Sequence, residues 1–262
     1  MRLLVSVRSA AEAVLAASNG ADIVDAKEPD AGPLGPVSGS VLHDIERALP
    51  SHVALGVALG DASDPDELTE VLDCVAPTAR EGETFLKVGF AGVSRAEQVA
   101  AVLRRAVDRA RELGPSVRVI AASYADCDRA RTLSPESILD AAIGVGAAGV
   151  LIDTWIKDGR GLLRHLSLAA LAAWVIRARR ANLLTALAGS LTADDLEILR
   201  DVEPDVVGIR GAACRGGRSG TLDPHSLQWL RATLDQVAGP FGLPSSGREL
   251  PDPDVHLSPL RR

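Results

Sequence analysis

Short apolar runs alternate with amphipathic stretches along most of the 262-residue chain. Eight runs rich in Val, Ile, Leu and Ala are typical of strands buried on both faces, and a helical pattern follows each run. The predicted strands cover 2–7, 22–27, 53–59, 84–88, 117–122, 149–153, 183–187 and 206–209. The predicted helices cover 10–18, 41–48, 65–79, 95–113, 135–145, 168–180, 193–200 and 224–237.

Repeated strand–helix units predict parallel pairing, and eight units in a chain of this length predict a closed barrel. We therefore expect an α/β fold, a (β/α)8 TIM barrel, over residues 1–238 as a single catalytic domain. Residues 239–262 are rich in proline and show no hydrophobic period, so we expect a C-terminal tail outside the barrel.

Hydroxyl side chains stand before several predicted helices and are expected to cap them. Ser9 with Glu12 and Ser94 with Glu97 have the complete spacing of a capping box, whereas Thr192 has the hydroxyl without the usual Glu or Gln. These signals place the starts of the helices independently of the apolar pattern.

The composition argues against several classes of function. Aromatic residues make up 3% of the chain and the net charge is −7, which disfavours stacking on single strands and binding along a duplex. The sequence has no charge-free run of about twenty apolar residues. Three isolated cysteines and five scattered histidines suggest neither a disulfide framework nor a metal site. We expect a cytoplasmic protein without membrane, nucleic-acid, metal or cofactor partners.

The chain contains only three lysines, Lys27, Lys87 and Lys157, among 28 basic residues. Each lysine lies at or shortly after the end of a predicted strand, where the active sites of such barrels are found. Arginine stays charged at any working pH, whereas a buried lysine can lose its proton. The positions therefore indicate amine chemistry, although a preference for arginine elsewhere would explain the scarcity alone.

Strand alternation brings carboxylates to the same mouth. Asp25 shares a face with Lys27, and Asp153 ends the strand that precedes Lys157; Ser6 and Ser123 are expected to line the same bowl. Such a set can perturb the pKa of each member, and a neutral lysine can form an imine with a carbonyl while a second moves protons. Structural ion pairs are the alternative.

Glycine-rich turns follow the last two predicted strands, in ALAGSL and IRGAACRGGRSG. Backbone N–H groups in such turns can hold a phosphate, as they do after strands seven and eight of many barrels. We expect that site to be formed by Gly189, Ser190, Gly211, Ala212 and Arg210.

One family shares these motifs in order. The segments GADIVDAKEPDAGPLG, FLKVGF, AASYAD, LIDTWIKDGRGLL, ALAGSL and VGIRGAACRGG resemble the (5-formylfuran-3-yl)methyl phosphate synthases, also called 4-(hydroxymethyl)-2-furancarboxaldehyde-phosphate synthases. The resemblance covers about residues 1–237. It does not extend to the tail, whose composition bears more on assembly than on catalysis.

The resemblance implies a lyase that joins two glyceraldehyde 3-phosphate molecules with loss of phosphate and water, toward methanofuran or a related furan carrier of one-carbon units. By the match to DAKEP, Lys27 would form a Schiff base. By the match to LKVG, Lys87 would accept a proton, and Asp25, Asp153 and Lys157 would orient the lysines or assist dehydration. The sequence leaves open whether the chain associates with itself.

Two other functions remain open from the sequence. A class I aldolase or a sugar-phosphate isomerase could use the same scaffold and would differ in its product. A non-catalytic barrel that binds a phosphorylated metabolite would have no need of a neutral lysine.

Overall fold

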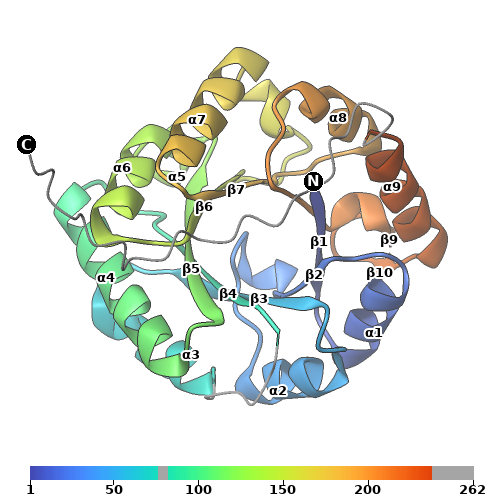
Figure 1. Cartoon of the computed structure of the whole chain (residues 1–262), viewed down its shortest axis with the longest axis horizontal. Coiled ribbons are helices and arrows are strands. Elements are labelled where there is room, and N and C mark those ends of the chain that lie inside the picture. The colour runs from blue at the N-terminus through green and yellow to red at the C-terminus, as the bar shows by residue number, and fades with distance from the viewer. Residues whose placement is uncertain (76–81, 238–262) are drawn as a thin grey trace, which may run out of the picture.

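The eight predicted strands form a closed parallel barrel in the computed structural model, which describes residues 1–75 and 82–237. The order β1 to β8 runs continuously around the ring, and β8 pairs with β1 (Figure 1). The strands are β1 Arg2–Val7, β2 Ile23–Ala26, β3 Ala54–Asp61, β4 Thr84–Gly89, β5 Val117–Tyr124, β6 Gly149–Asp153, β7 Leu184–Leu187 and β8 Val206–Ile209. The fold prediction is confirmed.

Helices surround the ring of strands (Figure 1). They are α1 Ala10–Ser18, α2 Gly39–Ala48, α3 Thr69–Cys74, α4 Ala96–Leu113, α5 Cys127–Ala130, α6 Pro135–Val145, α7 Leu168–Arg180, α8 Ala193–Ile198 and α9 Pro224–Val237. Single 3-10 turns include η1 Pro29–Ala31, η2 Pro65–Leu68, η3 Leu162–Arg164, η4 Leu199–Asp201 and η5 Gly211–Ala213. The predicted tail at 239–262 lies outside the described residues.

Two layers of apolar side chains divide the core. The larger layer lies between the strands and the helices and includes Leu3, Val5 and Leu103. The smaller layer fills the inside of the barrel and includes Ile23 and Phe85. Because successive residues of a strand face opposite sides, each strand supplies both layers, which explains why its apolar run is nearly continuous.

The predicted third helix is shorter than its pattern suggested. The stretch begins with the 3-10 turn Pro65–Leu68, and α3 ends at Cys74; residues 76–79 of the prediction lie outside the described part. No helix among residues 1–75 and 82–237 is long and apolar enough to cross a membrane.

The helix caps differ from the prediction in a way that bears on the site. Ser9 Oγ accepts the backbone N–H of Glu12. The Glu12 carboxylate, however, accepts the backbone N–H of Arg8 and the guanidinium of Arg210 rather than the backbone N–H of Ser9, so this capping box is incomplete. The complete box is instead the one at the start of α8, where Thr192 and an aspartate three residues later bond reciprocally. The aspartate side chain is long enough to complete this box. The prediction missed it because a Glu or Gln was expected at that position.

The second predicted box is not formed. Arg95, rather than Ser94, stands at the cap position of α4, and no side chain caps that helix.

A short antiparallel hairpin follows β8 and was not predicted. Its strands are β9 Cys214–Arg215 and β10 Thr221–Leu222. Gly216 and Gly217 both have positive φ, which allows the tight turn between the two strands. The strands are too short for an alternating pattern to show in the sequence. The hairpin lies beside β1 and α1 (Figure 1).

Candidate active site

A cavity of about 500 Å³ occupies the carboxyl-terminal mouth of the barrel. Its floor is formed by apolar side chains of the inner layer, such as Leu4 and Ile23, and its walls by the loops that follow the strands. A volume of this size suits a small metabolite. The ten residues predicted for catalysis or phosphate binding all line it: Asp25, Lys27, Lys87, Asp153, Lys157, Gly189, Ser190, Arg210, Gly211 and Ala212.

Asp25 and Lys87 form a buried ion pair between β2 and β4. Lys87 Nζ lies 2.5 Å from Asp25 Oδ1, and both side chains are almost completely buried. Ser6 on β1 donates from Oγ to Asp25 Oδ2 at 3.1 Å. Gly56 on β3 makes room for the carboxylate, because a β-carbon there would lie 2.6 Å from Asp25 Oδ1. The Asp25 carboxylate of β2 is therefore surrounded by residues of β1, β3 and β4.

Asp153 and Lys157 form a second pair at the end of β6. Lys157 Nζ lies 2.6 Å from Asp153 Oδ1 and donates to Thr154 Oγ1 at 3.0 Å. The backbone N–H of Thr154 also donates to Asp153 Oδ1, at 2.7 Å. Burial alone would raise the pKa of Asp153, but the ammonium groups of Lys157 and Lys27 outweigh it and the pKa falls. Asp153 is thus held as a carboxylate.

Lys27 interacts electrostatically with both pairs and, within the described ranges, is the lysine that has no carboxylate partner of its own. It is 8% exposed and forms no ion pair with a described residue, although Lys87 and Lys157 each do. Burial lowers the pKa of Lys27 to about 8; Asp153 and Asp25 oppose this, while Lys87 and Lys157 add to it. The amine is therefore available as a nucleophile near neutral pH.

The glycine-rich turns after β7 and β8 face the same cavity. Gly189 has a φ of 104° and Ser190 one of 53°, and Gly211 and Ala212 belong to the turn η5. Among the described residues, the backbone N–H groups of these four residues have no acceptor. Unpaired N–H groups that converge on a cavity are a ready site for a phosphate.

The chain belongs to the 4-HFC-P synthase family, because the family model matches residues 3–231. A (5-formylfuran-3-yl)methyl phosphate synthase of Methanopyrus kandleri is 36% identical over 89% of this chain and 98% of its own length. One of Archaeoglobus fulgidus is 34% identical over 85% and 94%. The names of these relatives identify the family as a family of synthases.

Solved structures with low identity share the barrel of this family member. Phosphoribosyl anthranilate isomerase from Thermus thermophilus superimposes with a TM-score of 0.60 at 17% identity, covering 90% of this chain and 100% of its own. A 3-hexulose-6-phosphate synthase gives 0.58 at 17% identity, over 89% and 100%. At these identities the likeness shows the fold alone.

Arg210 lines the cavity, but its guanidinium is already engaged. It donates to both carboxylate oxygens of Glu12 and to the backbone carbonyls of Ser6, Arg218 and Gly220. An arginine has five N–H donors, and these five acceptors take them all. Arg210 therefore braces the β8 loop in this 4-HFC-P synthase family member, and we do not retain it as a direct phosphate ligand.

Ser123 does not line the cavity, contrary to the expectation. Its Oγ donates to the carbonyl of Leu151, and its side chain faces the outer layer. The strand β5 continues to Tyr124, so Ile120 and Tyr124 face inward and Ser123 faces outward by alternation.

The sequence assigned no role to two further residues of the site. Arg218, on the hairpin after β8, lines the cavity. Asp126, after β5, accepts the backbone N–H groups of Trp155 and Ile156 at 2.6 and 3.0 Å and so holds the loop that carries Lys157. The role of Asp126 has no local signal in the sequence, because its partners lie 29 and 30 residues away.

Removing the Asp126 carboxylate is expected to slow turnover by misplacing Lys157. In Asp126→Ala the loop loses two hydrogen bonds to a buried, charged acceptor, and we expect kcat to fall by about tenfold to a hundredfold. The matched control is Asp128→Ala, which removes the same charge from an exposed position two residues away. Steady-state kinetics of both variants check this; a kcat of Asp126→Ala equal to that of the control would contradict the positioning role.

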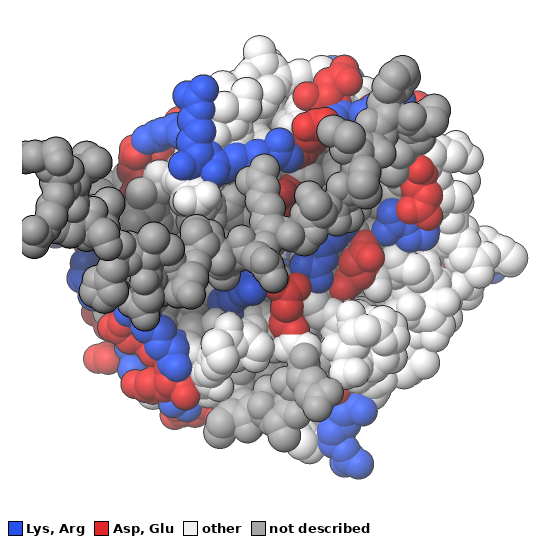
Figure 2. Space-filling model, in the orientation of Figure 1, with Lys and Arg blue, Asp and Glu red and all other residues white. Residues whose placement is uncertain are grey.

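The remaining charges are distributed without a dominant sign on the face shown in Figure 2, where acidic and basic side chains stand side by side. No group of three or more metal-ligating side chains that could hold an ion occurs among the described residues.

Proposed function

We propose that this chain condenses two molecules of glyceraldehyde 3-phosphate into (5-formylfuran-3-yl)methyl phosphate. The balance of atoms requires the loss of one orthophosphate and two molecules of water. The observation that carries this proposal is the buried amine of Lys27, with a pKa of about 8, in a cavity that also holds two lysine–aspartate pairs. Membership of the 4-HFC-P synthase family supports the same product.

Lys27 is the proposed nucleophile. Its neutral amine attacks the carbonyl carbon of one triose phosphate, and expulsion of water gives an imine. The protonated imine withdraws electrons from the adjacent carbon, so a C–H bond there becomes acidic without help from a cofactor. The other two lysines are less suited to this step because each is already paired with a carboxylate.

Lys87 and Asp25 are the proposed proton-transfer pair. Asp25 first accepts a proton from the Lys87 ammonium group, and the neutral amine that this leaves takes the proton from the carbon next to the imine. The resulting enamine attacks the aldehyde carbon of the second triose phosphate and forms the new carbon–carbon bond. Asp153 and Lys157 then assist the eliminations in which one orthophosphate and two molecules of water leave, since a carboxylate and an ammonium group 2.6 Å apart can remove and supply protons. Hydrolysis of the imine takes back the water lost when it formed, and releases the product and the Lys27 amine.

The turns after β7 and β8 are the proposed phosphate clamp. The N–H groups of Gly189, Ser190, Gly211 and Ala212 are proposed to hold the phosphate that the product retains, because these residues line the cavity and their N–H groups have no acceptor in the part of the chain that the structure describes. Holding that phosphate fixes the triose against the lysines and excludes wrong poses. The product would supply the furan ring of methanofuran or of a related one-carbon carrier.

The test is incubation of the purified protein with glyceraldehyde 3-phosphate alone. We expect furan absorbance to appear together with one equivalent of orthophosphate for each product molecule. A reversible sugar phosphate without phosphate release would indicate an aldolase, and dihydroxyacetone phosphate alone an isomerase. Binding without any conversion would indicate a phosphometabolite-binding barrel.

The reactivity of Lys27 should rise with pH around its lowered pKa. At a pKa of about 8, roughly one amine in ten is neutral at pH 7 and half at pH 8, whereas an ordinary lysine near 10.5 has fewer than about one in a thousand at pH 7. We therefore expect its acylation rate to increase about fivefold from pH 7 to pH 8 and to level off above pH 9. Competitive acetylation with trace acetic anhydride, read peptide by peptide against Nα-acetyl-lysine, measures this. A half-point near pH 10.5 would contradict the assignment.

A further inference from the structure

Arg218 is a cation at the mouth of the cavity. It lies in the turn between β9 and β10, is half-buried, and lines the cavity together with Gly189, Gly211 and Lys157. Its Nη2 donates to the backbone carbonyl of Gly32, in the loop after β2, at 2.7 Å. The side chain therefore crosses from the loop after β8 toward the loop that follows Lys27.

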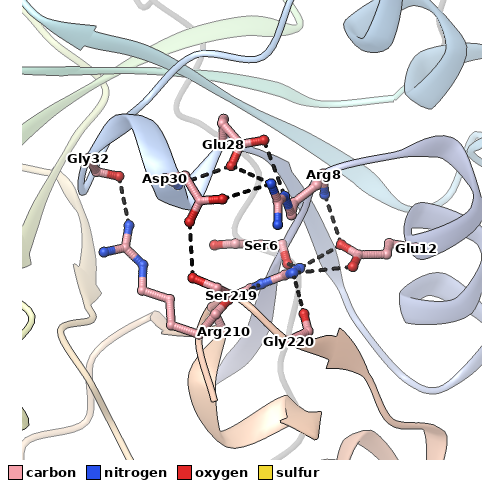
Figure 3. Close-up of polar contacts among 10 residues, drawn as sticks. Ser6, Arg8, Glu12, Glu28, Asp30, Gly32, Arg210, Ser219 and Gly220 are labelled. Atoms are coloured by element: carbon pink, nitrogen blue, oxygen red, sulfur yellow. Dashed lines mark hydrogen bonds and ion pairs between the residues drawn. The ribbon is translucent and has the colours of Figure 1, made fainter. Parts of the chain in front are cut away.

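Neighbouring contacts hold this hairpin against the barrel. Ser219 donates from Oγ to Asp30 Oδ1 at 3.0 Å, and Arg210 donates to the carbonyl groups on either side of it, those of Arg218 and Gly220. Figure 3 shows how Ser219 meets Asp30 of the loop after β2, and how Arg210 meets Gly220 within the segment that follows β8. The backbone that carries Arg218 is thus fixed, and its guanidinium is preorganised.

The charge of Arg218 is not matched by a carboxylate. Other arginines of this region are matched: Arg8 pairs with Glu28 at 2.9 Å, and Arg215 pairs with Asp223 at 2.8 Å. Arg218 forms no ion pair with any residue in the described ranges, and its single hydrogen bond leaves four N–H donors. Burial lowers its pKa, and the carboxylates of Asp153, Asp30 and Glu28, which raise it, do not offset that effect.

A fork of free donors facing a cavity suits a phosphate group, which a guanidinium binds through two parallel hydrogen bonds. The proposed reaction brings two phosphates into one cavity, and the N–H groups after β7 and β8 account for one. We infer that Arg218 binds the phosphate of the second triose phosphate, so that both substrates are held at the same time. This inference rests on the proposed function for the identity of the ligand.

The probe is sn-glycerol 3-phosphate, which carries the phosphate but no carbonyl and so cannot react with Lys27. Isothermal titration calorimetry of the whole chain should find two equivalents bound. Arg218→Met should bind one equivalent tightly, with the second weakened at least about tenfold. In the furan assay the same variant should lose at least about tenfold in kcat/KM.

Two control variants separate phosphate binding from other effects. Arg215→Met removes the same charge from the same hairpin at an exposed position, and Ser219→Ala removes a contact that holds the hairpin without touching the cavity. Both should keep two equivalents. If Arg218 only holds the hairpin, Ser219→Ala and Arg218→Met should behave alike, which would overturn the inference.

Further outcomes separate this inference from the proposed function. Two equivalents with unchanged affinity in Arg218→Met, or a single equivalent in the wild type, would overturn the second phosphate site even if furan is formed. Two equivalents in the wild type and one in the variant, without any furan, would support the site and refute the reaction. Should Arg218→Met not fold, Arg218→Lys replaces it, since lysine keeps the charge but lacks the paired N–H donors of a guanidinium. Weakened binding of the second equivalent of sn-glycerol 3-phosphate then supports the inference, and binding equal to that of the wild type overturns it.

Discussion

Lys27→Arg is expected to lose turnover by about four orders of magnitude or more while keeping its fold, as other enzymes do when a covalent nucleophile is removed. Arginine preserves the positive charge and nearly the length of the side chain. It cannot present a neutral amine, because its guanidinium remains protonated at any working pH. Without an amine no imine forms, and the adjacent C–H bond is not activated.

The same substitution at another lysine of the cavity provides the control. Lys157→Arg keeps a cation beside Asp153 and removes only the proton that Lys157 is proposed to supply in the dehydrations, so we expect a loss near the lower end of general acid catalysis, about a hundredfold. Initial rates of furan formation, with circular dichroism to verify folding, compare the two. Similar losses in both variants would contradict a unique nucleophilic role for Lys27.

Lys87→Met is expected to reduce both catalysis and stability. Removing a general acid–base group costs about 10²- to 10⁴-fold in rate. It also leaves Asp25 buried beside β3 without its cation, and breaking a buried pair from one side typically costs about 3–5 kcal/mol. We therefore expect kcat to fall by about 10²- to 10⁴-fold and the urea concentration at the midpoint of unfolding to fall clearly below that of the wild type.

A double variant separates the two effects. In Asp25→Asn with Lys87→Met neither side chain is charged, so most of the lost stability should return while the activity should not. Urea unfolding and furan formation measure the two properties independently. Recovery of activity in the double variant would show that Lys87 acts only by compensating Asp25.

The sequence predicted the barrel because buried parallel strands leave a strong local signal. The apolar runs fixed which residues form β1 to β8, and alternation placed Asp25, Lys87 and Asp153 on the inner face. The same rule failed at Ser123, since β5 extends to Tyr124 and the end of the strand could not be located from its apolar run. An inner face is predictable only where the register of the strand is known.

The contacts between loops could not be predicted from the sequence. Arg210 was expected to bind phosphate because it begins the glycine-rich turn after β8, but its guanidinium donates to Glu12, which lies 198 residues away. The contact of Arg218 with Gly32 spans 186 residues. Such pairings depend on how the closed ring brings the loops after β8, β1 and β2 together, and no local pattern records it.

The most direct measurement is reductive trapping of the wild-type protein with borohydride in the presence of glyceraldehyde 3-phosphate. Tandem mass spectrometry of the digested protein should find a single major adduct, on Lys27, with the mass of the reduced triose phosphate. An adduct confined to Lys87 or Lys157, or turnover to the furan with no adduct on Lys27, would contradict the account.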